Sequence, residues 1–79
     1  MVTELTLFSR EGCHLCEDML FALQNLSGQH GFSVRVVDID EGSILREELN
    51  AAIPLLLLNG KVVSQYHLNY DVLQKALST

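Results

Sequence analysis

Hydrophobic and polar residues alternate near the beginning of the chain. In residues 4–8 (ELTLF) the two leucines fall on one side, and the glutamate and the threonine fall on the other. Alternation with a period of two is typical of a half-buried β-strand. The pattern stops at residues 9–12 (SREG), where polar residues and a glycine interrupt it. The sequence therefore predicts a first strand that ends close to residue 9.

Apolar residues recur at helical spacing after this strand, starting from Cys16. Residues 27–31 (SGQHG) then supply glycines that suit a helix C-cap and a turn. One amphipathic helix is therefore predicted between these two points. Its apolar face comprises Met19, Leu20, Leu23 and Leu26.

A second strand and a short second helix are predicted in the middle of the chain. Residues 32–39 (FSVRVVDI) are rich in β-branched side chains and are bounded by turn residues, which indicates a strand. Ile44, Leu45 and Leu49 then suggest a short helix, which must end before Pro54.

The last third of the chain predicts a hairpin followed by a helix. Residues 54–58 (PLLLL) form a continuous apolar run, which suits a central strand covered on both faces. The Asn-Gly pair at 59–60 is a strong turn signal leading into residues 61–65 (KVVSQ), so the third and fourth strands should be antiparallel neighbours. A final helix is indicated by the apolar positions that follow, Tyr70, Leu73 and Leu77.

Together these elements predict one α/β domain over residues 1–79 with the order βαβαββα. The first crossover should be right-handed and leave the first two strands parallel. Helices would then cover both faces of a four-stranded mixed sheet. With 79 residues and 48% hydrophobic content, the chain is close to the lower size at which one core supports a fold.

The charge of the chain argues against several classes of partner. Five lysines and arginines against ten acidic residues leave a net charge of −5, and no basic run is interleaved with aromatic residues. We therefore expect no nucleic-acid or membrane partner. The N-terminal residues lack the features of a secretory signal, and residues 51–58 (AAIPLLLL) are too short to span a bilayer. We expect a cytoplasmic monomer.

Chemistry is suggested by the chain's two cysteines, Cys13 and Cys16, at the predicted meeting point of the first strand and the first helix. In a reducing compartment a close pair is more often catalytic or metal-binding than structural. A disulfide that closes so short a loop restricts the unfolded chain little. At a helix start, unpaired N–H groups and the helix dipole favour a thiolate. We therefore expect Cys13 to attack a substrate disulfide and Cys16 to resolve the mixed disulfide.

Charged neighbours act on Cys13 in both directions. Arg10 and a protonated His14 would stabilise its thiolate, whereas Glu17 and Asp18 would disfavour it. We expect the pKa of Cys13 to lie below the reference thiol value of about 8.5.

Residues 5–16 (LTLFSREGCHLC) and 52–63 (AIPLLLLNGKVV), followed by a closing helix, resemble the glutaredoxin-like proteins of the thioredoxin-fold superfamily. The resemblance covers essentially the whole chain and extends to a small bacterial glutaredoxin-like family of unknown function. It implies a cis Ile53–Pro54 bond facing the cysteines. The Ile53 backbone would then pair with an extended substrate or glutathione, and Pro54 would keep metal ions off the thiols.

The chain departs from typical glutaredoxins around the predicted site. His14-Leu15 replaces the usual Pro-Tyr between the cysteines, and no Gly-Gly follows the fourth strand. Arg10 and Asp71 are the candidates for charged contacts to glutathione. We expect Leu15 to contact the substrate together with Ile53 and Pro54. No bound cofactor or metal is expected, and the electron donor is either glutathione or a thioredoxin-reductase-type protein.

Three functions remain open from the sequence. The leading hypothesis is a thiol-disulfide oxidoreductase acting on a protein or small-molecule disulfide. The second is a catalytically silent thioredoxin-fold module that binds a partner protein beside Pro54. The third is a zinc or cluster site shared between subunits, because two thiolates are at most half of a zinc site. His30 and His67 are expected to be loop or surface residues. Tyr66 and Tyr70 are expected to pack, and the less favoured alternative is that either one borders the active cleft.

Overall fold

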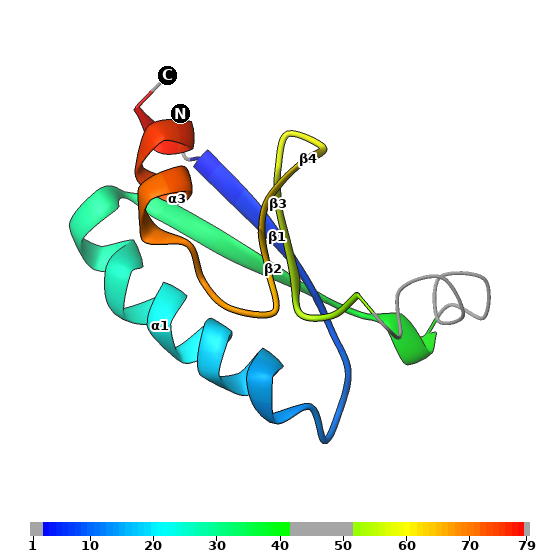
Figure 1. Ribbon diagram of the computed structural model, residues 1–79. Helices are drawn as coiled ribbons and strands as arrows, with labels where there is room; N and C mark the ends of the chain where they lie inside the picture. Colours follow the sequence, from blue (N-terminus) through cyan, green and yellow to red (C-terminus); the bar gives the residue numbers. More distant parts are fainter. Residues whose placement is uncertain (1–2, 42–51, 79) are drawn as a thin grey trace.

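The computed structural model describes residues 3–41 and 52–78 and follows the predicted order of strands and helices (Figure 1). The second helix, predicted from Ile44, Leu45 and Leu49, lies outside the described residues. The described elements are β1 (Thr3–Ser9), α1 (His14–His30), β2 (Phe32–Asp38), the 3-10 helix η1 (Ile39–Glu41), β3 (Leu55–Leu58), β4 (Lys61–Gln65) and α3 (Tyr70–Leu77).

The sheet has the strand order β2-β1-β3-β4. β1 pairs with β2 in parallel and with β3 antiparallel, and β4 pairs antiparallel with β3. Leu5 of β1 is the partner of Val34 on one side and of Leu58 on the other. This confirms the predicted parallel first pair and antiparallel closing hairpin, and it makes β1 an interior strand of the sheet.

Both described helices pack on the same face of the sheet (Figure 1). Met19 and Leu23 of α1 and Leu73 of α3 share one core cluster with side chains of β1. The prediction that helices cover both faces of the sheet also involves the second predicted helix, which falls outside the described residues. The remaining buried members of the cluster are Leu5, Leu7, Phe32, Leu56, Leu58 and Val63.

The turn between β3 and β4 has the geometry that its Asn-Gly sequence predicts. Asn59 and Gly60 both have positive φ, 52° and 82° respectively. Positive φ at both central residues is the signature of the type I′ turn, whose twist matches that of the flanking strands. The predicted hairpin is therefore confirmed at the level of its turn residues.

α1 is longer than the glycine pattern suggested. Residues 27–30, expected as a turn, continue the helix, and His30 lies exposed in its last turn. The helix ends at Gly31, which has a left-handed conformation and whose N–H donates to the Ser27 carbonyl. Gly28 is tolerated inside the helix because packing of the apolar face outweighs its weak helix propensity. No helix in the described part of the chain is long and apolar enough to span a membrane.

The core position of Leu23 gives a direct test of this packing. Leu23 is fully buried, so Leu23→Ala should lower the free energy of unfolding by about 2–5 kcal/mol through lost burial and a residual cavity. Phe21→Ala on the same helix is the control, because Phe21 is 66% exposed and its loss should change stability by less than about 0.5 kcal/mol. Urea denaturation measures both, and equal losses would contradict the assigned core.

Candidate functional site

A tight turn carries the chain from the end of β1 to the start of α1. Gly12 has a φ of 81°. This left-handed conformation is unfavourable for residues that carry a Cβ atom. The N–H of Cys13 donates to the carbonyl of Arg10 at 3.3 Å and closes the turn. The turn therefore delivers Cys13 to the N-terminal end of α1.

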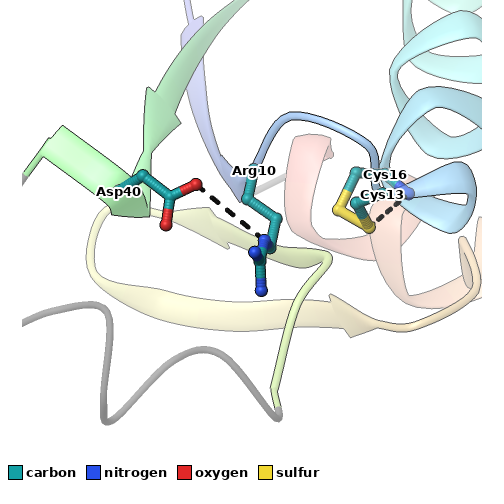
Figure 2. Close-up of a disulfide and its surroundings, with 4 residues drawn as sticks. All are labelled: Arg10, Cys13, Cys16 and Asp40. Carbon is teal, nitrogen blue, oxygen red and sulfur yellow. Dashed lines mark hydrogen bonds and ion pairs between the residues drawn. A yellow bond between two sulfur atoms is a disulfide. The ribbon is translucent and has the colours of Figure 1, made fainter.

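Cys13 is the N-cap residue of α1 and forms a disulfide with Cys16 (Figure 2). The Cα atoms of the two cysteines are 5.2 Å apart, within the usual disulfide range. The Sγ of Cys13 accepts the N–H of Cys16 at 3.2 Å. A sulfur thus occupies the place where a serine, threonine or aspartate oxygen usually caps a helix. In the reduced protein, unpaired backbone N–H groups and the positive end of the helix dipole would favour the thiolate form of Cys13.

The two cysteines differ in exposure. Cys16 is 3% exposed, whereas Cys13 is only partly buried. The difference arises because Cys16, one helical turn further on, faces the interior. This is the asymmetry that an accessible attacking thiol and a sheltered resolving thiol require.

A small apolar cluster separate from the main core lies beneath the disulfide. Cys16 packs there with Ile39 and Ile53, and Phe8 and Cys13 pack against them. Ile53, predicted from the sequence, is thus brought to the cysteines. Phe8 and Ile39 were not singled out as site residues. The signal that would have found them is their position at the ends of neighbouring parallel strands, where open α/β sheets place their sites.

Pro54 follows Ile53 through a cis peptide bond and is fully buried. Its carbonyl accepts the N–H of Tyr66 at 2.9 Å. Since its side chain is buried, any contact between a substrate and this segment must involve its backbone or the neighbouring residues. The roles of Ile53 and Pro54 toward a substrate stay predictions.

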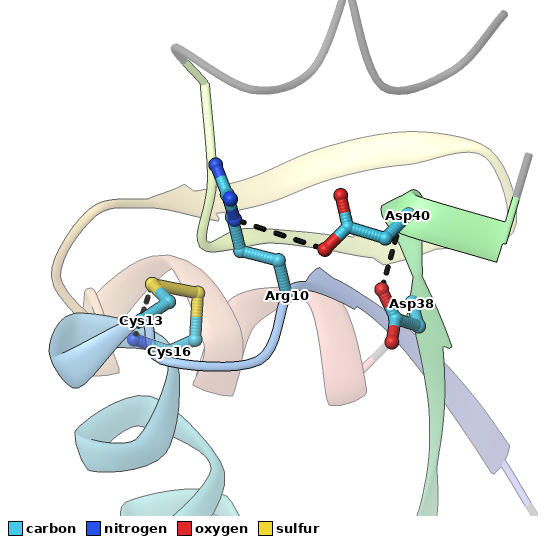
Figure 3. A network of polar contacts seen from close by, with 5 residues as sticks. All are labelled: Arg10, Cys13, Cys16, Asp38 and Asp40. Carbon is cyan, nitrogen blue, oxygen red and sulfur yellow. Dashed lines mark hydrogen bonds and ion pairs between the residues drawn. A yellow bond between two sulfur atoms is a disulfide. The ribbon is translucent and has the colours of Figure 1, made fainter. Parts of the chain in front are cut away.

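Arg10 contacts an acidic residue that the sequence analysis did not connect with it. Its Nε lies 3.9 Å from Oδ2 of Asp40, and both side chains are partly exposed. Figures 2 and 3 show Arg10 between Asp40 and the disulfide. The N–H of Asp40 in turn donates to Oδ1 of Asp38 at 2.8 Å, in the turn that ends β2 (Figure 3). Asp40 therefore offsets part of the positive charge that Arg10 would exert on Cys13.

His14 lies on the exposed side of the first turn of α1. Its Nε2 is 3.5 Å from Oδ2 of Asp18, four residues further along the helix. Glu17 is also exposed in this turn. The carboxylate of Asp18 would balance a charged His14, whereas the backbone N–H groups at the start of α1 supply a fixed positive potential at Cys13. The influence of His14 on the thiol stays a prediction.

Tyr66 and Tyr70, for which packing was favoured over a place at the border of the active cleft, are both exposed. Tyr66 and Tyr70 are 43% and 53% exposed. Tyr66 follows directly after β4, where the chain leaves the sheet, and Tyr70 is the first residue of α3. Together with Leu15 they line a shallow groove of ≈ 190 Å³. His67 is exposed on the same connection, as expected for a surface residue.

The described residues gather no three His, Cys, Asp or Glu side chains in a position to share a metal ion. Asp71, considered as a charged contact, is exposed in the first turn of α3.

The chain is similar to known proteins over nearly its whole length. The sequence profile of the glutaredoxin-like domain (DUF836) matches residues 4–78. The solution NMR structure of protein Ne2328 from Nitrosomonas europaea is 34% identical, with a TM-score of 0.81 over 95% of this chain and 91% of that chain. The uncharacterized protein Rv0508 of Mycobacterium tuberculosis is 28% identical over 71 residues, which cover 84% of this chain and 73% of that protein.

The fold also matches that of a glutaredoxin. Glutaredoxin C1 from Populus tremula x tremuloides, in its holo form, has a TM-score of 0.59 and 23% identity over 99% of this chain and 82% of that chain. These similarities confirm the predicted glutaredoxin-like fold.

The capping sulfur predicts a difference between two substitutions of Cys13. Both Cys13→Ser and Cys13→Ala remove the disulfide, but only serine keeps an acceptor for the Cys16 N–H. The serine variant should be more stable by about 0.5–2 kcal/mol, the usual contribution of an N-cap side chain. Chemical denaturation under reducing conditions measures the difference, and indistinguishable midpoints would count against the capping contact.

The Arg10–Asp40 pair predicts opposite shifts of the Cys13 pKa. Alkylation rate against pH should show an inflection below the reference value of about 8.5 in the reduced protein. Arg10→Gln should move this inflection up, because a cation is lost. Asp40→Asn should move it down, because Arg10 is no longer offset.

Glu4→Gln serves as the control for this experiment. Glu4 lies exposed near the opposite end of β1 and should leave the inflection unchanged. Shifts of the same sign in the Arg10 and Asp40 variants would refute the assignment.

Proposed function

The chain belongs to the glutaredoxin-like domain family (DUF836), and on this premise we propose that it is a dithiol-disulfide oxidoreductase acting through Cys13 and Cys16. The observation that carries the proposal is the arrangement of the pair. A partly accessible sulfur caps α1, and a buried sulfur stands within bonding distance of it. A crosslink that served stability alone would gain little from so short a loop.

In the first step the reduced protein attacks its substrate. The Cys13 thiolate forms a bond to one sulfur of a substrate disulfide, and the substrate S–S bond breaks. One substrate thiolate leaves and takes up a proton, while the other substrate sulfur stays bound to Cys13. The N–H of Cys16 and the start of α1 stabilise the attacking thiolate.

In the second step the protein resolves this mixed disulfide. Cys16, after losing its proton, attacks the Sγ of Cys13, and the second substrate thiolate leaves. The substrate gains two electrons and two protons, and the protein holds the Cys13–Cys16 disulfide seen in the structure. Burial of Cys16 limits attack on it from outside, so it reacts mainly with its neighbour.

A thiol donor must then return two electrons to the disulfide. We propose either glutathione or a thioredoxin-reductase-type protein as this donor, and a protein or a small molecule as the disulfide substrate. Ile53, in contact with Cys16, supports a substrate-facing role for the Ile53–Pro54 segment. We place the reaction in the cytoplasm, where such donors keep thiols reduced.

Turnover with defined electron donors tests the proposal. The wild-type protein should reduce a model disulfide when supplied with glutathione and its reductase, or with thioredoxin reductase. Cys13→Ser should abolish the reaction with both donors. Cys16→Ser should accumulate a mixed disulfide on Cys13 or retain only a monothiol reaction, because no internal thiol releases the substrate.

The control for these variants is a substitution that leaves both thiols in place. Phe21→Ser, on the exposed side of α1, should turn over like the wild type. Absence of turnover with both donors would contradict the proposal and favour a silent module that binds a partner beside Pro54. Activity retained in Cys13→Ser would contradict the assignment of the nucleophile.

A further inference from the structure

A shallow groove runs between α1 and the connection from β4 to α3. One wall belongs to α1 and the other to the connection and the start of α3. Its volume is ≈ 190 Å³, enough for one or two side chains but not for a large cofactor. The lining residues are Leu15, Asp18, Met19, Ala22, Tyr66, His67, Leu68 and Tyr70.

The groove is joined to the redox pair on both walls. Leu15 stands between the two cysteines in the sequence and lines one wall. On the other wall, Tyr66 donates its N–H to the carbonyl of Pro54. The residue before Pro54, Ile53, lies outside the lining and packs on Cys16. A chain bonded to Cys13 through a disulfide would therefore have the groove within reach of its next residues.

The backbone holds Tyr66 in this exposed position at a cost. Its φ is 66°, in the left-handed region that bulky side chains rarely adopt. Such outliers persist where the surrounding structure determines them, and they concentrate at ligand-binding sites. Hydrogen bonds also hold the connection that follows. The N–H of His67 donates to the carbonyl of Gln65 at 2.7 Å, and the N–H of Asn69 donates to Oγ of Ser64 at 2.9 Å. The side chain of Asn69 caps α3.

The charges around the groove discriminate between classes of disulfide. Its described lining contains His67 and the carboxylate of Asp18, which lies 3.5 Å from Nε2 of His14, and no lysine or arginine. Glu17 and Asp71 are exposed nearby on the two helices that flank it. Glutathione carries two carboxylates and a net negative charge, so these acidic groups would disfavour it relative to a basic peptide. Aromatic and aliphatic walls beside acidic groups instead suit an apolar side chain next to a basic one.

We propose that this groove is the specificity site for protein disulfides. It receives the segment beside the substrate cysteine, with an apolar side chain between Leu15 and the two tyrosines and a lysine or arginine toward Asp18. The inference rests on the proposed oxidoreductase function and names its substrate class. Tyr66, Tyr70 and Asp18 are then specificity residues that do not take part in the sulfur chemistry.

The test compares rates of reduction for matched disulfides. The first substrate is a peptide Lys-Cys-Leu, blocked at both ends and joined to 2-mercaptoethanol. The second peptide replaces lysine with glutamate and leucine with serine. Glutathione disulfide and the small uncharged 2-hydroxyethyl disulfide complete the set.

Each rate of reduction is divided by the rate for 2-hydroxyethyl disulfide, because this ratio cancels differences in thiol reactivity between variants. The first peptide should be favoured over the second and over glutathione disulfide by about tenfold or more.

Variants then assign the preference to the groove. Tyr70→Ser should lower the ratio for the first peptide severalfold, and so should Tyr66→Gly, which keeps a residue that accepts positive φ. Asp18→Lys should reverse the preference toward the acidic peptide. Phe21→Ser is the matched control for a lost aromatic ring, because Phe21 is exposed and outside the groove.

Glu4→Lys is the matched control for the reversed charge, since Glu4 is exposed on β1. Equal ratios for the two peptides in the wild type, or an unchanged preference in Tyr70→Ser and Asp18→Lys, would overturn the inference while leaving the oxidoreductase intact. Failure to reduce even 2-hydroxyethyl disulfide would refute the proposed function itself, and the inference with it.

Discussion

The contact between the Cys13 sulfur and the first turn of α1 is the constraint around which the site is built. The Sγ of Cys13 must lie where the N–H of Cys16 points, which fixes both the start of the helix and the position of the reactive sulfur. β1 holds this point in place, because its buried leucines are anchored between two neighbouring strands. Helix geometry then sends Cys16 into the interior. The difference in exposure between the two sulfurs therefore follows from their separation by three positions at a helix start.

Backbone N–H groups at the start of α1 are a fixed source of positive potential at this site. The first turn of α1 carries the acidic Glu17, and the cation Arg10 lies 3.9 Å from the carboxylate of Asp40. The chain as a whole has a net charge of −5. Fixed N–H groups at a helix start do not titrate, so they support a thiolate over a wide pH range. This source of positive potential does not depend on the net charge of the chain.

Sequence patterns predicted the features that depend on interactions between residues close together in the chain. The strand alternation in residues 4–8, the Asn-Gly turn and the apolar face of α1 all report preferences of neighbouring residues, and the structure contains each of them. Cys13 and Cys16 were recognisable because their spacing places both sulfurs at one helix start.

Tertiary contacts were not predictable in the same way. The Arg10–Asp40 pair joins the ends of β1 and β2, and no pattern in either segment indicates it. Tyr66 and Tyr70 are large aromatic residues of a kind that often packs in protein cores, but a left-handed backbone and a helix start expose them.

The most direct test of the proposed site is to map which sulfur of the reduced wild-type protein reacts first. Fragment-ion mass spectrometry after substoichiometric alkylation at neutral pH should place the label on Cys13, with Cys16 unmodified. Equal labelling of the two cysteines, or label on Cys16, would contradict it.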